Sequence, residues 1–225
     1  MPATPLRIPS DGIALEGWLH TPPGDGPFAV AVVCHPHPLY GGSMHNNVVD
    51  AAVSGLNARG LAAIRFNFRG VGGSGGTHSG GAGEQADVRA ALRHAGTIAA
   101  LDAQRVALAG YSFGAMMAAA VAEPSIPALA LVALPLARVE DALDALVAYP
   151  HPLLFVAGDR DQACAPDALR AFVERLHGHA EVSVVPGADH FFGGCEPAVE
   201  EAIGVFFAKA LTPPAAYVTR PDGRG

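Results

Sequence analysis

Runs rich in apolar and β-branched residues, separated by segments of helical pattern, limit most strongly how this chain can fold. The runs cover residues 28–34, 61–68, 105–111, 128–134, 152–158 and 181–187. The helical patterns cover 46–59, 84–100, 113–123, 138–148, 166–177 and 196–210. A strand without polar alternation is typically buried on both faces. The alternation therefore predicts a parallel sheet with helices on both faces, preceded by a half-buried strand at 13–20.

The composition suits such a buried sheet and excludes several other classes of protein. Half of the 225 residues are apolar and only 16% are charged, which is enough apolar surface for a sizeable core. The net charge is −7 and the 14 basic residues form no run, so no nucleic-acid partner is expected. No apolar stretch reaches the roughly 18 residues of a membrane span. We predict one domain over residues 1–211 and a proline-rich tail at 212–225.

The cysteines and the first residues bear on the compartment. Cys34, Cys164 and Cys195 are widely spaced and form neither a disulfide framework nor a zinc-binding pattern. The first residues lack the basic end and apolar core of a signal peptide. Reduced thiols without a leader predict a cytoplasmic protein.

The pattern Gly-x-Ser-x-Gly occurs twice, and its surroundings differ between the two occurrences. Ser112 stands between the apolar run 105–111 and the helical segment 113–123. Ser74 lies in a glycine-rich stretch with no helical pattern until residue 84. A serine nucleophile with this pattern needs a sharp strand-to-helix turn that exposes its hydroxyl. We therefore expect Ser112 to be the nucleophile and Ser74 to be a loop residue.

A serine hydroxyl needs a histidine to accept its proton and a carboxylate to orient that histidine. His190 directly follows the last predicted strand, so it reaches the edge of the sheet where Ser112 lies. Asp159 and Asp161 compete for the third role, since both follow the strand before it. Asp161 lies further out, where the loop can curl back toward the histidine, whereas Asp159 is placed to hold the turn. The pattern favours Asp161 and leaves Asp159 open.

Acyl transfer also needs two backbone N–H groups to stabilise the oxyanion. The residue after the nucleophile, Phe113, supplies one. The other is expected from the loop 35–42, which reads HPHPLYGG. Because proline has no N–H, His37 is the preferred donor and Leu39 the second choice. The same loop presents Leu39 and Tyr40, which we expect to contact the substrate.

Two further patterns point only weakly to a cofactor or a metal. The stretch GVGGSG at 70–75 matches a dinucleotide-binding pattern, but that site needs a helix to begin at once, and here several loop residues intervene. Several histidines could suggest a metal site, yet no carboxylate or cysteine cluster accompanies them. We expect neither a cofactor nor a metal ion. The histidines concerned are His35, His37, His45 and His190.

Taken together, these motifs resemble those of the α/β-hydrolase superfamily. The matching segments are HPHP at 35–38, GGSMHNN at 41–47, RFNFRGVGGS at 65–74, GYSFG at 110–114, GDRD at 158–161 and the late histidine at 190. The closer similarity is to small bacterial serine hydrolases of about the size of dienelactone hydrolase. It extends over roughly residues 5–210.

This resemblance implies an α/β-hydrolase fold with an eight-stranded, mostly parallel sheet and an antiparallel strand near its start. It also implies a triad of Ser112, Asp161 and His190, with oxyanion donors at Phe113 and His37. Many relatives insert a lid domain after the strand that follows the nucleophile helix. Here the interval between residues 134 and 152 leaves room for one short helix, which predicts an open cleft for small acyl groups.

The expected function is hydrolysis of small carboxylic esters through an acyl-enzyme. Thioesterases, peptidases and lactonases use the same groups, and the fold does not choose among them. A non-catalytic binding protein on a hydrolase fold is the alternative from another class. The sequence predicts a small-molecule partner and leaves the oligomeric state open.

Overall fold

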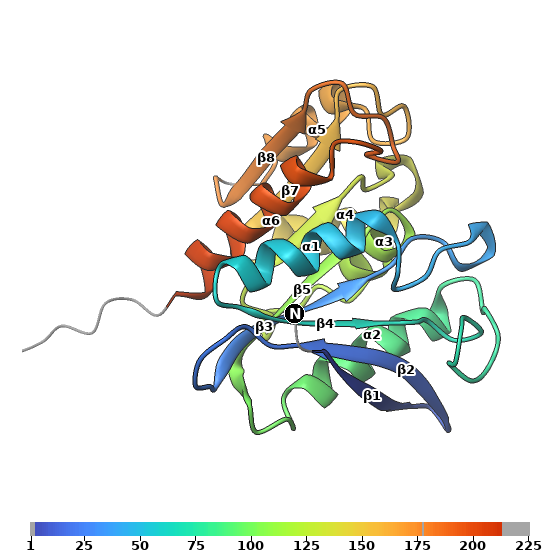
Figure 1. Cartoon of the computed structure of the whole chain (residues 1–225). Helices are drawn as coiled ribbons and strands as arrows, with labels where there is room; N and C mark the ends of the chain where they lie inside the picture. Colours follow the sequence, from blue (N-terminus) through green and yellow to red (C-terminus); the bar gives the residue numbers. More distant parts are fainter. Residues whose placement is uncertain (1–2, 177, 213–225) are drawn as a thin grey trace, which may run out of the picture.

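A computed structural model describes residues 3–176 and 178–212 and arranges eight strands in one mixed sheet (Figure 1). The strands are β1 (Ala3–Ser10), β2 (Ile13–His20), β3 (Phe28–Cys34), β4 (Ala62–Phe66), β5 (Leu101–Tyr111), β6 (Leu129–Val132), β7 (Leu153–Gly158) and β8 (Ala180–Val185). They lie in the order β1-β2-β4-β3-β5-β6-β7-β8. The strand β2 is antiparallel to both β1 and β4, and all pairs from β4 to β8 are parallel. The predicted mostly parallel sheet is confirmed.

Helices cover both faces of this sheet. In the described ranges they are α1 (Asn47–Ala58), α2 (Ala82–Ala95), α3 (Phe113–Ala120), α4 (Glu140–Ala148), α5 (Pro166–Val173) and α6 (Glu196–Leu211), with short 3-10 helices η1 (Pro38–Tyr40) and η2 (Leu136–Arg138). The helices α1 and α6 pack side by side on one face, while α3 packs with α2 and α4 on the other (Figure 1). This layering buries the central strands completely, since every residue of β6 and β7 is buried. Such burial is why these strands lack polar alternation.

The strand β1 is absent from the sequence-based prediction, because most of its residues are exposed and two are prolines. It pairs with β2 along its whole length as an antiparallel hairpin. The two residues between these strands, Asp11 and Gly12, both have positive φ, at 44° and 81°. An Asp-Gly pair with this geometry is a strong hairpin signal. That dipeptide could have revealed the strand.

The boundary between α2 and β5 also differs from the expectation. The helical pattern predicts a helix up to residue 100, whereas α2 ends at Ala95 and Gly96 follows it as its cap. The strand β5 begins at Leu101, which pairs with Phe28 of β3. Pairing with a distant strand therefore extends β5 into a segment whose local pattern gave no strand.

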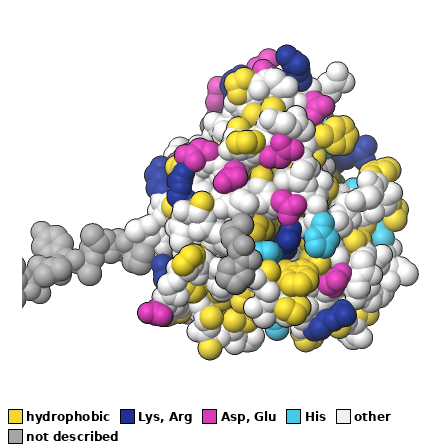
Figure 2. Space-filling view, viewed as in Figure 1, with side chains coloured by type: hydrophobic (Ala, Val, Ile, Leu, Met, Phe, Trp, Pro, Cys, Tyr) yellow, Lys and Arg dark blue, Asp and Glu magenta, His cyan; other side chains and the backbone are white. Residues whose placement is uncertain are grey.

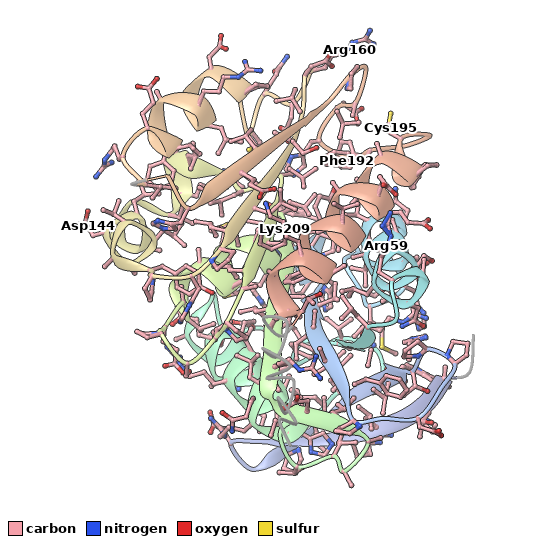
Figure 3. The ribbon with its side chains drawn as sticks, turned by 90° about the vertical axis from the view of Figure 1, so that its left-hand side faces the viewer. Arg59, Asp144, Arg160, Phe192, Cys195 and Lys209 are labelled. Atoms are coloured by element: carbon pink, nitrogen blue, oxygen red, sulfur yellow. The ribbon has the colours of Figure 1, made fainter. Side chains whose placement is uncertain are left out.

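The parallel strands end at one edge of the sheet, and the loops that follow them gather there. Figure 3 shows Arg160, which follows β7, at the same end of the molecule as Phe192 and Cys195, which follow β8. Between β6 and β7 the chain forms only η2, α4 and short connections. The prediction that no lid domain is inserted is confirmed, so no inserted domain covers the loops at this edge of the sheet.

The described surface has a mixed charge pattern. On the face shown in Figure 2, acidic and basic side chains lie scattered among apolar and neutral ones. Within residues 3–176 and 178–212, no helix is both long and apolar enough to cross a membrane. From residue 213 onward, the predicted proline-rich tail lies outside the described residues.

Candidate active site

Ser112 occupies a strained turn between β5 and α3. Its backbone angles are φ 53° and ψ −112°, a region that residues with a side chain rarely adopt. A Cβ atom on Gly110 would lie 2.2 Å from the carbonyl oxygen of Gly114, and one on Gly114 would lie 2.3 Å from that of Cys34. Both glycines of the motif are thus required by close backbone approach. The Ser112 side chain does not cap α3, so its hydroxyl is free for other contacts.

The turn brings Ser112 against two side chains from distant loops. Its Oγ lies 2.9 Å from Nε2 of His190, which follows β8. The other ring nitrogen of His190, Nδ1, lies 2.9 Å from Oδ2 of Asp161, which follows β7. The structure therefore brings together the serine, the histidine and the preferred aspartate of the sequence analysis. This is the connected arrangement that proton transfer from a serine requires.

The carboxylate of Asp161 is buried and held by several hydrogen bonds. Besides its contact with His190, it accepts hydrogen bonds from the backbone N–H groups of Ala163 at 2.8 Å and Cys164 at 3.0 Å. Burial raises the pKa of Asp161, but these hydrogen bonds outweigh it and hold the pKa below its usual value. The group is therefore an ionised carboxylate with a fixed orientation toward the imidazole.

The competing aspartate has a different environment. Asp159 is exposed, and its Oδ1 accepts a hydrogen bond of 2.8 Å from the N–H of Gly187. This contact ties the loop after β7 to the loop after β8. The neighbour of the histidine, Asp189, accepts from the N–H of Phe191 at 2.9 Å. Of the two alternatives left open by the sequence, the structure places Asp161 against His190.

A tyrosine to which none of the sequence motifs points holds the histidine loop. The Oη of Tyr111 donates a hydrogen bond of 2.8 Å to the backbone carbonyl of His190. Tyr111 is 3% exposed, and its ring lies edge-on to the buried ring of Phe192. The tyrosine occupies the variable position of Gly-x-Ser-x-Gly, so the motif gives no signal for it.

Of the two predicted oxyanion donors, Phe113 follows Ser112 in the chain, and His37 lines the same cavity as Ser112. Phe113 begins α3, and His37 precedes η1. Within the described part of the chain, neither backbone N–H donates a hydrogen bond to another residue. The N–H of Leu39, the second choice, is already engaged by Nδ1 of His37 at 3.2 Å. The geometry thus favours His37 over Leu39.

The imidazole of His37 packs within a cluster of rings. Its centroid lies 4.7 Å from that of Tyr40, 4.8 Å from that of Phe113 and 5.1 Å from that of His78. Burial lowers the pKa of His37, and the nearby His78 lowers it further. The side chain is therefore a neutral packing group that holds the loop against the start of α3.

A cavity of about 280 Å³ opens at Ser112 and His190. Its other walls come from the loop 36–42, Asn46, Tyr111 and Phe191. Of the two residues expected to contact the substrate, Tyr40 lines this cavity, whereas Leu39 is not among the lining residues and is 69% exposed. A larger hollow of about 460 Å³ lies beside α2 and the end of α3, where neither Ser112 nor His190 reaches it. The candidate site is therefore identified by the presence of Ser112 and His190, and not by the size of its cavity.

The second Gly-x-Ser-x-Gly serine has a structural environment. The hydroxyl of Ser74 donates to the carbonyl of Asn67 at 2.7 Å and accepts from the N–H of Glu16 at 2.9 Å. Both contacts fasten the glycine-rich loop to strand β2 and the end of β4. The expectation that Ser74 is a loop residue is confirmed.

The histidines of the early loop do not gather around a metal position. His35 is fully buried, with Nε2 accepting from the N–H of Phe68 at 3.0 Å and Nδ1 lying 2.6 Å from the carbonyl of Pro36. Burial lowers the pKa of His35 to about 4. Among the residues that the structure describes, no group of three His, Cys, Asp or Glu side chains is suited to hold a metal ion.

Comparison with known proteins places this arrangement in a family. A family model described as an alpha/beta hydrolase domain matches residues 31–198. An uncharacterized protein of Rickettsia prowazekii is 36% identical over 171 residues, which are 72% of this chain and 71% of that protein. The structure of an alpha-beta serine hydrolase homologue from Coxiella burnetii is 34% identical, with a TM-score of 0.80 over 90% of this chain and 96% of that chain.

A serine hydrolase without a lid from Xanthomonas campestris has a similar structure. It is 31% identical, with a TM-score of 0.79 over 95% of this chain and 98% of that chain. The matched family model spans both loops that carry Asp161 and His190 as well as the turn at Ser112. By its sequence and by its lidless architecture, the chain belongs to the alpha/beta hydrolase family.

Proposed function

We propose that this protein is a serine hydrolase that cleaves small carboxylic esters through an acyl-enzyme. The observation that carries the proposal is the connected series Ser112–His190–Asp161, with both contacts at 2.9 Å, on the wall of a cavity of about 280 Å³. Serine hydrolases among the similar structures agree with this chemistry. The small cavity and the missing lid favour a small substrate over a long-chain lipid.

In the proposed reaction, Nε2 of His190 accepts the hydroxyl proton as Oγ of Ser112 attacks the ester carbonyl carbon. The ionised Asp161 stabilises the imidazolium that forms. The N–H groups of Phe113 and His37 donate to the developing oxyanion. His190 then protonates the departing alcohol oxygen as the carbon–oxygen bond breaks, leaving an acyl group on Ser112. A water molecule, deprotonated by His190, then attacks the acyl carbon. His190 returns this proton to Oγ of Ser112 as the bond between Oγ and the acyl carbon breaks, which releases the carboxylic acid and restores the serine.

Other acyl-transfer reactions use the same groups, so thioester, lactone and peptide substrates are the nearest alternatives. A protein that only binds ligands on this fold is the alternative outside the enzyme class. A fluorophosphonate probe separates the enzyme from the binding protein, because it labels only an activated serine. We expect labelling of the wild type and none of the Ser112→Ala variant. A folded wild type that remains unlabelled would support the binding protein.

The two Gly-x-Ser-x-Gly serines provide a matched test of the nucleophile. We expect Ser112→Ala to lower the hydrolysis of 4-nitrophenyl acetate by several orders of magnitude, because it removes the attacking oxygen. Ser74→Ala loses two hydrogen bonds in a loop and should retain most of the activity. Turnover of both purified variants is the measurement. Loss of activity in Ser74→Ala with an active Ser112→Ala would overturn the assignment.

A further inference from the structure

Two exposed aromatic rings line the candidate active site. In the described part of the chain, the large apolar side chains left exposed are Leu39, Tyr40, Phe191 and Val205. Tyr40 is 87% exposed and Phe191 is 69% exposed, and both line the cavity at Ser112. Exposed apolar side chains gathered at one place on a surface mark a site of contact with a ligand or partner.

The backbone under both rings is fixed by hydrogen bonds. Tyr40 donates its N–H to the carbonyl of His37 at 3.0 Å, and its ring packs on the imidazole of that residue. The carbonyl of Phe191 accepts from the side-chain amide of Asn47 at 3.1 Å, and its N–H donates to Asp189 at 2.9 Å. The backbone that carries the two rings is thus fixed in two anchored loops, so a ligand that contacts them does not have to order the backbone there.

The residues that line the cavity carry no carboxylate, ammonium or guanidinium group, since no Asp, Glu, Lys or Arg is among them within the described ranges. A charged group that entered would lose hydration without gaining an ionic partner among the lining residues, and the exposed Arg138, whose charge acts on His37, is not one of them. The imidazole of His37 does not supply a cation either, because burial lowers its pKa. The lining therefore selects for neutral substrates.

We propose that Tyr40 and Phe191 form an aryl-binding clamp, so that the preferred substrates are uncharged esters carrying a phenyl-sized ring. Aromatic rings attract one another in offset-stacked and edge-to-face arrangements, which gives an aryl group an advantage over an alkyl group of similar reach. The cavity of about 280 Å³ lies at the small end of ligand pockets, which suits one ring beside the ester and excludes a long chain. The inference rests on the proposed ester hydrolysis, and the ring could belong to the acyl or to the alcohol part.

The first test uses the wild-type protein and matched esters. Methyl 3-phenylpropanoate, methyl 3-cyclohexylpropanoate and monomethyl succinate share a CH2 group next to the carbonyl, so their intrinsic reactivities are similar. The cyclohexyl ester matches the reach of the phenyl ester but has no aromatic ring. We expect kcat/KM, followed by acid release at constant pH, to be about tenfold higher for the phenyl ester than for the cyclohexyl ester, and lowest for the charged succinate. 2-Phenylethyl acetate against 2-cyclohexylethyl acetate tests a ring on the alcohol side. A preference for the phenyl ring on either side supports the clamp.

Variants then assign that preference to the two rings. Tyr40→Ala and Phe191→Ala should each lower the ratio of phenyl to phenyl-free kcat/KM by about threefold to tenfold. Tyr40→Phe keeps the ring and should keep the ratio. Val205→Ala is the matched control, since Val205 is exposed on α6 and does not line the cavity, and it should change neither ratio nor rate.

The outcomes separate failure of the clamp from failure of the proposed function. Hydrolysis of the phenyl-free esters with a ratio near one, or with a ratio unchanged in both alanine variants, would overturn the clamp alone. So would a preference for the succinate half-ester. A folded wild type that hydrolyses no ester and takes no fluorophosphonate label would overturn the proposed function and the clamp with it. If Tyr40 and Phe191 served only to contact another protein or a lipid surface, their alanine variants would leave the ratio of phenyl to phenyl-free kcat/KM unchanged.

Discussion

Two aspartates in one short loop have different hydrogen-bond partners. Asp161 faces His190 and is buried, whereas Asp159 is exposed and accepts from the N–H of Gly187. We expect Asp161→Asn to lower kcat by roughly a thousandfold or more, because an amide stabilises neither the imidazolium nor its correct tautomer. Asp159→Asn should lower the free energy of unfolding slightly and leave kcat nearly unchanged.

The measurement pairs turnover on one short-chain ester with urea unfolding of each variant. Equal, large losses of turnover in two well-folded variants would show that the acid cannot be assigned to Asp161 alone. The reverse ranking would assign the role to Asp159. Unfolding data are needed because Asp161 also accepts hydrogen bonds from the N–H groups of Ala163 and Cys164, so its replacement weakens the loop.

The proposed oxyanion donor at His37 can be tested through its backbone. The residue has φ −58°, which is close to the angle that a proline ring imposes. His37→Pro therefore removes the N–H with little backbone strain and should lower turnover about a hundredfold to a thousandfold. His37→Ala keeps the N–H and loses only ring packing, so about a tenfold loss or less is expected.

Circular dichroism of both variants checks that the loop change has not unfolded the protein. A metal or acid–base role for the imidazole predicts instead that alanine is as damaging as proline. An alanine variant without activity, or a wild type inactivated by a chelator, would contradict the oxyanion assignment. The packing of the ring on Tyr40 and Phe113 explains the modest loss expected for alanine.

At the scale of elements, the end of β5 fixes the segment between β8 and α6. Tyr111 ends that strand, and its hydroxyl holds the backbone carbonyl of His190. Tyr149, at the end of α4, is a matched control, because it is 2% exposed and its hydroxyl donates to the carbonyl of Ile126 at 2.7 Å. Each phenylalanine variant loses one hydrogen bond, which is buried at Tyr149 and partly buried at Tyr111, and the loss costs about 1–3 kcal/mol of stability.

Their effects on catalysis should differ. We expect Tyr111→Phe to lower kcat about tenfold with little change in KM, because an imidazole shifted by a fraction of an ångström transfers a proton less well. Tyr149→Phe should lower the unfolding free energy to a similar degree and leave kcat unchanged. Kinetics and urea unfolding of both variants are the measurement. A loss of kcat in both, or in neither, would leave Tyr111 as an ordinary packing residue.

At the scale of the whole molecule, two buried histidines make the stability depend on pH. Burial lowers the pKa of His35 and of His20 to about 4, and near His20 the charge of Arg65 adds to the effect. Each group binds a proton on unfolding, when its pKa returns to its usual value of about 6.5. Their contribution to stability is therefore complete above pH 6.5 and is lost as the pH falls toward 4.

Two such groups predict a fall in unfolding free energy of up to about 2.7 kcal/mol per pH unit in the middle of this window. Urea unfolding at pH 7.0, 5.5 and 4.5 measures it. His20→Gln removes one of the titrating groups and should reduce the slope by about half. A slope of zero between pH 6.5 and 4.5 would show that neither histidine is held neutral in the folded protein.

Much of the fold is encoded in short stretches of sequence. The central strands are apolar throughout because both of their faces are covered, and Ser112 stands out because its turn requires small neighbours within two residues. These are local requirements, so a single sequence displays them. The exposed strand β1 could not be predicted in this way, because it is held by pairing with β2 and not by burial.

The composition of the site depends on contacts between distant residues. His190 meets Ser112 across 78 positions and Asp161 across 29, and Tyr111 reaches the same loop across 79. The sequence placed Asp159 and Asp161 after the same strand, but only the path of the folded loop turned one toward the imidazole and the other toward Gly187. The placement of Tyr40 and Phe191 on the walls of one cavity has the same origin. Chain pattern determines which elements form, whereas side-chain direction at loop positions is decided by packing between elements that are far apart in the sequence.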